Sequence, residues 1–242
     1  MPIQHPVVKV AAVQAEPCWF NIDAGVEKTI KLITEYLLNA ITLHGSELLA
    51  IREACQKQKI YINLSFAERV AQGSSMWMAN VTIDDQGTII GHRRKIKPTG
   101  IERMLFGDAT GDTVNNVVQT PFGRVGNLQC WEHMQPLLKY HTYFQNEQIH
   151  CASWPCKFPY AGFEPWSFTR EAGIATTQTY AMEGGTFAVM ATNVMSEEGA
   201  RLQGIDLARS YFSVPGGGCS AVFAPDGKML TDLLEPGAEG IV

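Results

Sequence analysis

Cys130 stands where a short buried strand is predicted to end and a helix to begin. Residues 124–129 are typical of a strand, and residues 132–140 are typical of a helix. The first backbone N–H groups of a helix have no internal partners, so they favour a thiolate, the nucleophilic form of cysteine. The same groups can hold negative charge that develops on a substrate atom. The alternative is a buried cysteine that acts as a small hydrophobic residue.

Three charged residues could assist this thiol. Lys95 follows a predicted hairpin strand, and an ammonium group beside a cysteine lowers the pKa of the thiol and stabilises an anionic intermediate. Alternatively, Lys95 is a surface lysine, and Lys97 competes with it for the role. Glu102 could orient the lysine or the thiol, or it could simply pair with Arg103. Glu132 could be no more than a favourable charge at a helix N-terminus.

The composition is that of an ordinary globular protein. The chain has 242 residues, of which 45% are hydrophobic and 18% are charged, enough for one α/β domain with a sizeable core. The net charge of −5 and the scattered basic residues argue against a nucleic-acid partner, and the one basic run, residues 92–97, is interpreted as a solvated loop at a strand end. Six cysteines without a CxxC pair, no secretory signal and no membrane-length apolar run predict a cytoplasmic protein with reduced thiols.

Apolar periodicity predicts a single domain over residues 1–242, with mixed sheets covered by helices. Strands are expected at 7–14, 60–66, 77–83, 88–91, 124–129, 148–153, 187–192, 220–223 and 229–233, and helices at 24–38, 46–57, 132–140 and 168–182. Two features are irregular. The helix at 24–38 passes almost directly to the helix at 46–57, so a strand is missing between them. Residues 239–242 look like the opening of a strand that does not continue.

Two stretches carry a resemblance to a known family: RRKIKPTGIERMLFGDATGD and, after it, GRVGNLQCWEHMQPLLKY. They resemble the nitrilases of the carbon–nitrogen hydrolase superfamily, especially the fungal and bacterial nitrile-hydrolysing branch. Weaker matches extend the similarity over nearly the whole chain: VKVAAVQAEP, EQIHCASWP, YAMEGGTFAV and GGGCSAVFAPDGK. The resemblance implies an α/β fold of the α-β-β-α sandwich type with a Cys–Glu–Lys site. It also implies a nitrile substrate, no metal or organic cofactor, and a homodimer that grows into higher homo-oligomers or spirals.

The family's site residues carry over by position. Cys130 matches the nucleophile, and Lys95, three residues before a proline, matches the catalytic lysine. Glu102 matches a second glutamate that supports the nucleophile. Lys95 and the backbone N–H near Trp131 would stabilise the nitrogen of the substrate as it becomes negative. Trp154 is a candidate for the substrate pocket, although such aromatic residues more often pack the core.

The chain also departs from the family pattern. The family's first glutamate, its general base, lies in a Phe-Pro-Glu segment that this sequence lacks. The gap coincides with the missing strand, near the junction of Glu35 and Tyr36. Gly100 replaces an expected histidine, and the family's final strand and tail are missing. Either the chain is a deleted form or its numbering leaves residues out. A real deletion would leave Cys130 without its proton acceptor.

Other functions stay open. Within the same fold, the substrate could be an amide, or cyanide hydrated to formamide, and a truncated chain could be a catalytically impaired assembly subunit. A zinc site from Cys130, His133, His150 and Cys151 is disfavoured, because neighbouring residues on a strand point to opposite faces. Phosphate binding by glycines 216–218 is weaker still, because a strand rather than a helix follows them.

Overall fold

The computed structural model describes residues 13–14, 39–162, 164–203, 205, 207, 212 and 214–242. The helix predicted at 24–38 and the junction of Glu35 and Tyr36 lie outside the described residues, as does most of the strand predicted at 7–14. The described end of that strand, β1 (Val13–Gln14), pairs antiparallel with β10 (Gly240–Ile241). This pairing agrees with the strand opening expected at 239–242.

Two larger sheets form the centre of the molecule. The first has three antiparallel strands in the order β2 (Ile62–Arg69), β3 (Met76–Ile83) and β4 (Ile89–Arg94). The second has five strands, of which the three central ones are parallel and the two at the edges antiparallel: β5 (Val117–Thr120), β6 (Gly123–Gln129), β7 (Ile149–Trp154), β8 (Phe187–Thr192) and β9 (Ala221–Phe223). The strands lie close to their predicted positions, except that the sequence does not predict β5. The strand predicted at 229–233 forms only an isolated bridge.

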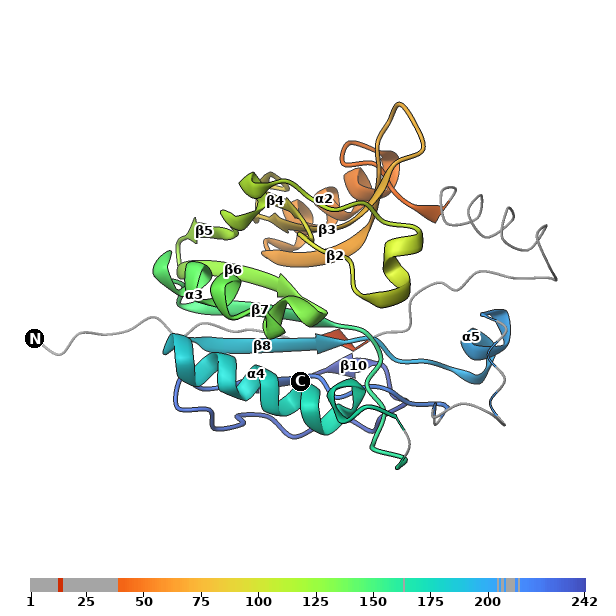
Figure 1. The fold of residues 1–242 in the computed structure, drawn as a ribbon. Coiled ribbons are helices and arrows are strands. Elements are labelled where there is room, and N and C mark those ends of the chain that lie inside the picture. Colours follow the sequence, from red (N-terminus) through yellow and green to blue (C-terminus); the bar gives the residue numbers. More distant parts are fainter. Residues whose placement is uncertain are drawn as a thin grey trace, which may run out of the picture.

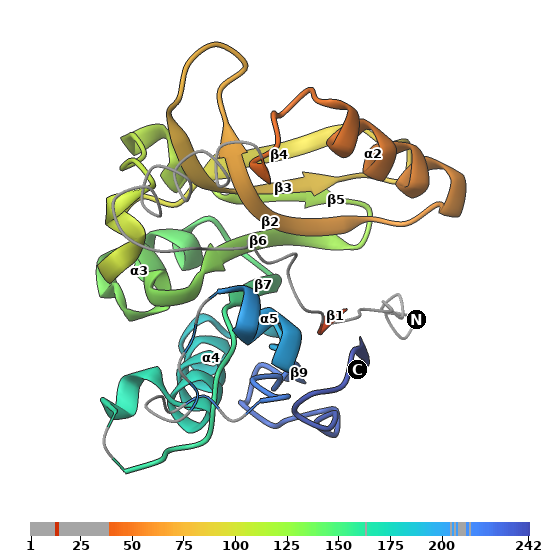
Figure 2. The same cartoon turned by 90° about the vertical axis from the view of Figure 1, so that its right-hand side faces the viewer.

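Helices cover the outer face of each sheet. On the first sheet, α2 (Ser46–Gln58) buries Leu48 and Cys55 against β3. On the second, α3 (Pro136–Phe144) contacts α4 (Arg170–Gly184), which packs against β7, β8 and β9. Figures 1 and 2 show α2 above the first sheet and α4 below the second, with the two sheets between them, which confirms the predicted α-β-β-α sandwich. None of the helices in the described part of the chain has the length and apolar character that a membrane crossing requires.

The two sheets meet through polar as well as apolar contacts. The hydroxyl of Ser65 donates to that of Ser153 over 2.9 Å, and an apolar cluster around Val125 fills another part of the same inner face. The side-chain amide of Gln129 donates to the backbone carbonyl of Ala79 on β3 over 2.7 Å. Since Gln129 is the last residue of β6, this bond ties the end of that strand to the opposite sheet.

The docking of α2 gives a test of the outer layer. Replacement of the fully buried Leu48 by Ala should lower the free energy of unfolding by about 3 kcal/mol, because the missing side chain leaves a cavity. Replacement of the neighbouring Leu49, which is 48% exposed, should cost about 0.5 kcal/mol. Urea unfolding followed by circular dichroism measures both variants. Equal losses would contradict this packing of α2.

Candidate active site

The chain reverses direction at Cys130, immediately after β6. Cys130 has a φ of 50°, in the left-handed region that a residue with a side chain rarely adopts. The backbone N–H of Trp131 donates a hydrogen bond to the sulfur of Cys130. The 3₁₀ helix η3 (Cys130–Met134) follows, and the α-helix begins only at Pro136. The prediction of one helix over residues 132–140 is therefore wrong in its start, and the N–H group at the sulfur belongs to a 3₁₀ turn.

Burial dominates the ionisation of Cys130. The residue is 9% exposed, and burial raises the pKa of its thiol above the ordinary value. Lys95, Lys157 and the N–H of Trp131 act in the opposite direction, and Glu102 adds to the increase, so that the pKa stays raised. The N–H group of the turn thus favours the thiolate, as expected, but the sequence did not reveal the burial that outweighs it. The neutral thiol is the favoured form, because burial outweighs the neighbouring cations.

Lys95 and Glu102 form an ion pair next to Cys130. The side chain of Lys95 is fully buried, and its Nζ donates to Oε2 of Glu102 over 2.7 Å. The same oxygen accepts the backbone N–H of Thr99 at 2.6 Å, which fixes the start of the 3₁₀ helix η1 (Gly100–Met104). Both charged groups are close enough to Cys130 to change the pKa of its thiol. The structure thus brings together the three residues that the resemblance selects.

The competing partners of these residues lie at the surface. The side chain of Lys97 is 63% exposed and forms an ion pair with Asp108. Arg103, the alternative partner of Glu102, instead lies 4.0 Å from Asp108. Neither alternative contact therefore takes part in the arrangement around the thiol.

Glu132 has a larger role than the helix-terminal charge that the sequence suggests. Its two carboxylate oxygens accept hydrogen bonds from Arg93 of β4 at 2.6 and 2.7 Å, and both side chains are at most 3% exposed. The carboxylate also accepts the backbone N–H groups of Gln129 at 2.9 Å and Ile96 at 3.1 Å. Burial opposes the ionisation of Glu132, but Arg93 and these N–H groups outweigh it and lower its pKa. Glu132 therefore joins the end of β4 directly to the turn at Cys130.

The basic run at residues 92–97 begins inside a strand and is not the solvated loop that its composition suggests. Successive side chains of β4 point to opposite faces of the sheet, so its cations divide between two sides. On one side, His92 and Arg94 contact Glu68 at 2.8 and 2.5 Å. Burial raises the pKa of Glu68, but these two partners outweigh it and lower that pKa to about 2. On the other side, Arg93 reaches the second sheet.

The tryptophans beside the site differ in their surroundings. Trp154, the candidate pocket residue, is 3% exposed, and its indole N–H donates to the hydroxyl of Thr177 over 3.1 Å. Its ring stacks on that of His133 at a centroid distance of 4.8 Å. Trp154 belongs to the buried apolar cluster that also contains Cys130. This position favours packing over substrate contact. Trp131 is half-buried, and its ring lies 5.4 Å from that of Phe168.

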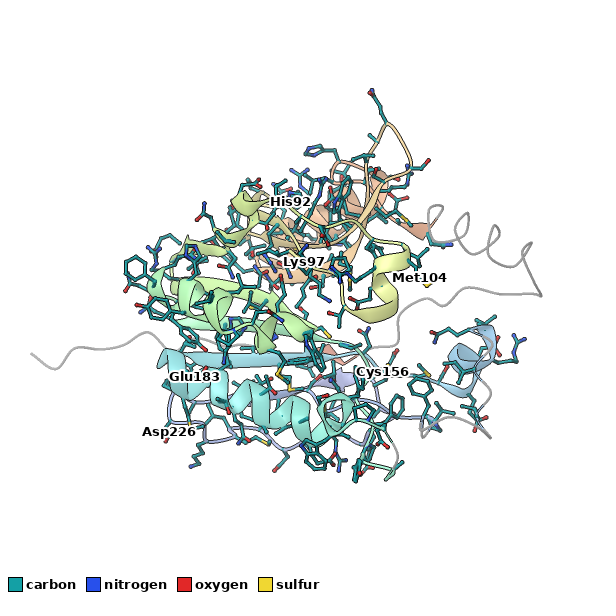
Figure 3. All side chains as sticks on the ribbon, in the orientation of Figure 1. His92, Lys97, Met104, Cys156, Glu183 and Asp226 are labelled. Atoms are coloured by element: carbon teal, nitrogen blue, oxygen red, sulfur yellow. The ribbon has the colours of Figure 1, made fainter. Side chains whose placement is uncertain are left out.

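A cavity of about 590 Å³ opens beside the site. Neither Cys130 nor Lys95 is among its lining residues, which are Ile96, Lys97, Pro98, Thr99, Gly100, Arg103, Trp131, Glu132, Gln135, Pro136, Leu137 and Leu138. In Figure 3, Met104 and Cys156 lie on the right, the side towards which β6 and β7 run, whereas Glu183 and Asp226 lie on the left. Cys130 directly follows the last residue of β6. The site therefore lies at the carboxyl ends of parallel strands, where α/β proteins commonly bind their ligands.

The described residues do not form the alternative metal and phosphate sites. His133 and His150 do meet, with 2.9 Å between their Nε2 atoms, but Cys151 lies on the other face of β7 and packs with Val189. No group of three or more His, Cys, Asp or Glu in the described ranges is arranged to hold a metal ion. The backbone N–H of Gly216 donates to the carbonyl of Met195 and that of Gly218 to the carbonyl of Pro236, which leaves neither donor for a phosphate.

Comparison with known proteins places this geometry in a family. The family model of carbon-nitrogen hydrolases matches residues 33–242. The chain belongs to the carbon-nitrogen hydrolase family. It is 41% identical to a cyanide hydratase from Armillaria gallica, over 97% of this chain and 76% of that protein. It is 40% identical to an arylacetonitrilase from Hypocrea virens, over 98% of this chain and 82% of that protein.

Solved structures of other family members share the fold of this carbon-nitrogen hydrolase. A carbon-nitrogen hydrolase from Helicobacter pylori G27 has a TM-score of 0.66 at 17% sequence identity, covering 96% of this chain and 86% of that one. A nitrilase-superfamily member from Saccharomyces cerevisiae has a TM-score of 0.65 at 15% identity, with the same coverage. At such low identities the likeness concerns the fold alone.

The pair of Arg93 and Glu132 gives a test of how the turn is held. Arg93→Met and Glu132→Gln should each lower the free energy of unfolding by about 4 kcal/mol, because each leaves a buried group without its partner. The double variant should lose less than the sum, because the two residues interact directly. Arg201→Met, which breaks an exposed pair with Glu198, is the control and should leave the urea midpoint unchanged. Single variants that behave like this control would show that the pair does not hold the turn.

Proposed function

We propose that this carbon-nitrogen hydrolase converts a nitrile to a carboxylic acid and ammonia, with Cys130 as the nucleophile and Lys95 and Glu102 as its supporting residues. The observation that carries the proposal is the Lys95–Glu102 ion pair beside a cysteine in a left-handed turn. The relatives named arylacetonitrilase and cyanide hydratase support a substrate with a carbon–nitrogen triple bond. A nitrile carbon is a weak electrophile, which a soft sulfur attacks more readily than a hydroxyl oxygen does.

In the proposed reaction, the thiol of Cys130 gives up its proton and the sulfur bonds to the nitrile carbon, while one π bond of the nitrile opens. The nitrogen becomes negative, is stabilised by the ammonium of Lys95 and the N–H of Trp131, and takes up a proton to give a thioimidate. Water adds to the carbon, the nitrogen leaves as ammonia, and a thioester remains. A second water hydrolyses the thioester, which releases the acid and restores the thiol. These steps use no metal or organic cofactor.

The thioimidate can also lead to the release of an amide. After water adds, the carbon carries sulfur, nitrogen and oxygen, and either its bond to nitrogen or its bond to sulfur can break. Breaking the carbon–sulfur bond releases an amide, which for cyanide is formamide. The cyanide hydratase relative, 41% identical to this chain, favours this alternative. Parallel assays of ammonia and amide from a nitrile, from cyanide and from an amide separate the three reactions.

We also propose that residues 1–242 form one domain that lacks an internal segment near residues 35 and 36. The alignment with the cyanide hydratase spans 272 positions, more than the 242 residues of the chain, which supports a loss of internal residues. By the family resemblance, that segment would carry the first glutamate. Glu102 acts on the thiol of Cys130 but already accepts hydrogen bonds from Lys95 and Thr99. Without the first glutamate to accept the proton of the thiol, turnover should be slow. The alternative function is that of a catalytically impaired assembly subunit.

Substitution of the proposed site residues tests the reaction. Cys130→Ala should abolish the release of ammonia from phenylacetonitrile, because the sulfur that forms the thioimidate is gone. Lys95→Met should lower kcat/KM at least about 10²-fold through the loss of charge stabilisation. Lys97→Met is the matched control, since its side chain lies at the surface, and it should keep full activity. Undiminished turnover in Cys130→Ala would contradict the proposal.

We propose that the chain forms a homodimer or a larger homo-oligomer through the outer face of α3. Leu137, Tyr140 and Phe144 are 85%, 67% and 74% exposed, and their spacing places them on one side of the helix. A continuous apolar surface of this kind commonly marks a contact with another protein surface. A second copy of the chain is the partner that the family resemblance implies.

A charge in this stripe tests the contact. Leu137→Glu should shift the mass measured by light scattering towards that of a single chain, because a carboxylate cannot be buried without a partner. Leu230→Glu, at a residue 50% exposed outside α3, is the control and should leave the mass unchanged. The same mass for Leu137→Glu and the unsubstituted protein would show that α3 does not form the contact.

We place the protein in the cytoplasm. None of the five cysteines in the described ranges forms a disulfide: Cys55, Cys130, Cys151, Cys156 and Cys219. Free thiols persist in reducing compartments, which supports this location.

A further inference from the structure

A line of buried polar side chains runs from the turn at Cys130 into the core. Nδ1 of His133 lies 2.7 Å from the backbone carbonyl oxygen of Cys130, and its Nε2 lies 2.9 Å from Nε2 of His150. Nδ1 of His150 lies 2.7 Å from Oε1 of Glu147, and the hydroxyl of Tyr180 donates to Oε2 of Glu147 over 2.7 Å. All four side chains are at most 6% exposed. The proposed reaction does not use them.

The carbonyl of Cys130 determines the direction of each hydrogen bond in this line. A carbonyl only accepts, so His133 carries a proton on Nδ1. In a neutral His133 the other ring nitrogen accepts, and the proton between the two rings belongs to Nε2 of His150. Nδ1 of a neutral His150 accepts in turn, so the proton beside it comes from Glu147. Tyr180 donates to the remaining oxygen of this carboxyl group.

We propose that Glu147 is a neutral carboxylic acid whose O–H orders the hydrogen bonds through His150 and His133 and so holds the peptide group of Cys130 in its left-handed turn. His133 is then a positioning residue, because it contacts the backbone of the nucleophile and not the substrate. This positioning role rests on the proposed function, whereas the proton order along the line does not.

The electrostatic surroundings agree with neutral groups along the line. Burial raises the pKa of Glu147 to about 8, and the hydrogen bond from Tyr180 lowers it only in part. Burial lowers the pKa of His133 to about 3, with His150 acting in the same direction. Burial also lowers the pKa of His150 well below its ordinary value, and Arg93 lowers it further. The charge of Glu132 opposes both histidine shifts without reversing them.

Among the described residues, the packing around Glu147 leaves room for a carboxylic acid and places no lysine or arginine that shifts its pKa. The titratable groups that act with it are Tyr180 on α4, Tyr143 on α3, and His150 and Cys151 on β7. On β6 the facing residue is Gly126, where any Cβ would collide with the carboxyl group of Glu147. The glycine thus makes the space in which this carboxyl group reaches its histidine.

The competing arrangement is an ion pair, with a carboxylate at Glu147 and an imidazolium at His150. Glutamine at position 147 separates the two. Its amide N–H can donate to His150 and its carbonyl can accept from Tyr180, as a neutral acid does, but it cannot neutralise an imidazolium. Glu147→Gln should therefore preserve the line, and Glu147→Met, which has a similar length but no donor, should break it.

Thermal unfolding between pH 6.5 and pH 9 tests the protonation state. A carboxyl pKa that is higher in the folded than in the unfolded protein adds stability at low pH, and this stability is lost as the pH rises towards about 8. The unsubstituted protein should therefore lose about 5 °C in Tm over this range beyond the change in Glu147→Gln, which has no proton to lose. The lowered histidine pKa values act below about pH 6.5 and do not contribute in this window. Parallel Tm curves for the two proteins would overturn the proposal.

Nitrogen-15 NMR of the histidine rings at pH 7 tests the proton order directly. We expect a neutral His133 protonated on Nδ1 and a neutral His150 protonated on Nε2, in both the unsubstituted protein and Glu147→Gln. An imidazolium at His150 in the unsubstituted protein would overturn the neutral-acid assignment, whether or not the protein hydrolyses nitriles.

Alkylation by iodoacetamide, followed residue by residue with mass spectrometry, tests the positioning role. Loss of the line should let the Trp131 N–H move away from the sulfur, so the pH midpoint for alkylation of Cys130 should rise by about one unit in Glu147→Met. Glu147→Gln should keep the midpoint, and Cys156 serves as the internal control in each sample. Where nitrile turnover is measurable, kcat should fall about 10²-fold in Glu147→Met with little change in KM. Equal midpoints in all three proteins would overturn the positioning role and leave the nucleophile assignment to the Cys130→Ala assay.

Discussion

The buried pair of Arg93 and Glu132 is the contact on which the geometry of the site depends. Two charges out of water are costly unless their hydrogen bonds are all made, and here the carboxylate accepts two from the guanidinium and two from backbone N–H groups. The pair joins β4 of one sheet to the end of β6 in the other. Lys95 lies two positions after Arg93, and Cys130 lies two positions before Glu132. Such short spans of backbone leave little freedom, so the ion pair between the sheets also sets how the ammonium group faces the sulfur.

A second constraint is that the sulfur of Cys130 lies in a buried environment, which opposes its ionisation. Burial raises the pKa of the Cys130 thiol, while Lys95 and Lys157 lower it. Lys157 is itself 3% exposed, and its Nζ lies 4.7 Å from the centre of the Trp154 ring. Burial lowers the pKa of Lys157, and the nearby thiols of Cys130 and Cys219 act against this. The two lysines therefore matter most once a thiolate or an anionic intermediate forms, since each is a buried cation that gains from a new negative charge.

Local sequence patterns predict the helices and strands because the side chains that become buried recur along the chain with the period of each element. The strand predicted at 187–192 forms β8 with those bounds, and α2 begins at Ser46 as predicted. Local patterns predict the residues of the site less well. Lys95 and Lys97 are alike by local pattern, and only the family resemblance separates them. Arg93 and Glu132 are 39 residues apart, so nothing near either one reveals the other. The sequence signal for the role of Arg93 is the position of the basic run in a strand. Side chains alternate between the two faces of a strand, so neighbouring cations point to opposite sides. The turn has the expected effect on the Cys130 thiol, but the net rise of its pKa could not be predicted, because burial is a property of the whole fold and not of the turn.

On the proposal that the chain lacks the family's first glutamate, these contacts explain how it can keep a shaped site. The described contacts that hold the turn come from β4, from β6 and, through His133, from the core beneath it. None of these contacts draws on residues near 35 and 36. On that proposal, the missing segment takes away a proton acceptor but not the frame around the sulfur. Glu102 cannot replace the acceptor without giving up the bonds that hold Lys95 and Thr99, and Glu147 is held in the core by Tyr180 and His150. On the proposals made above, the step that suffers is deprotonation of the thiol. The capture of an electrophile, once the thiolate exists, still has Lys95 and the Trp131 N–H in place.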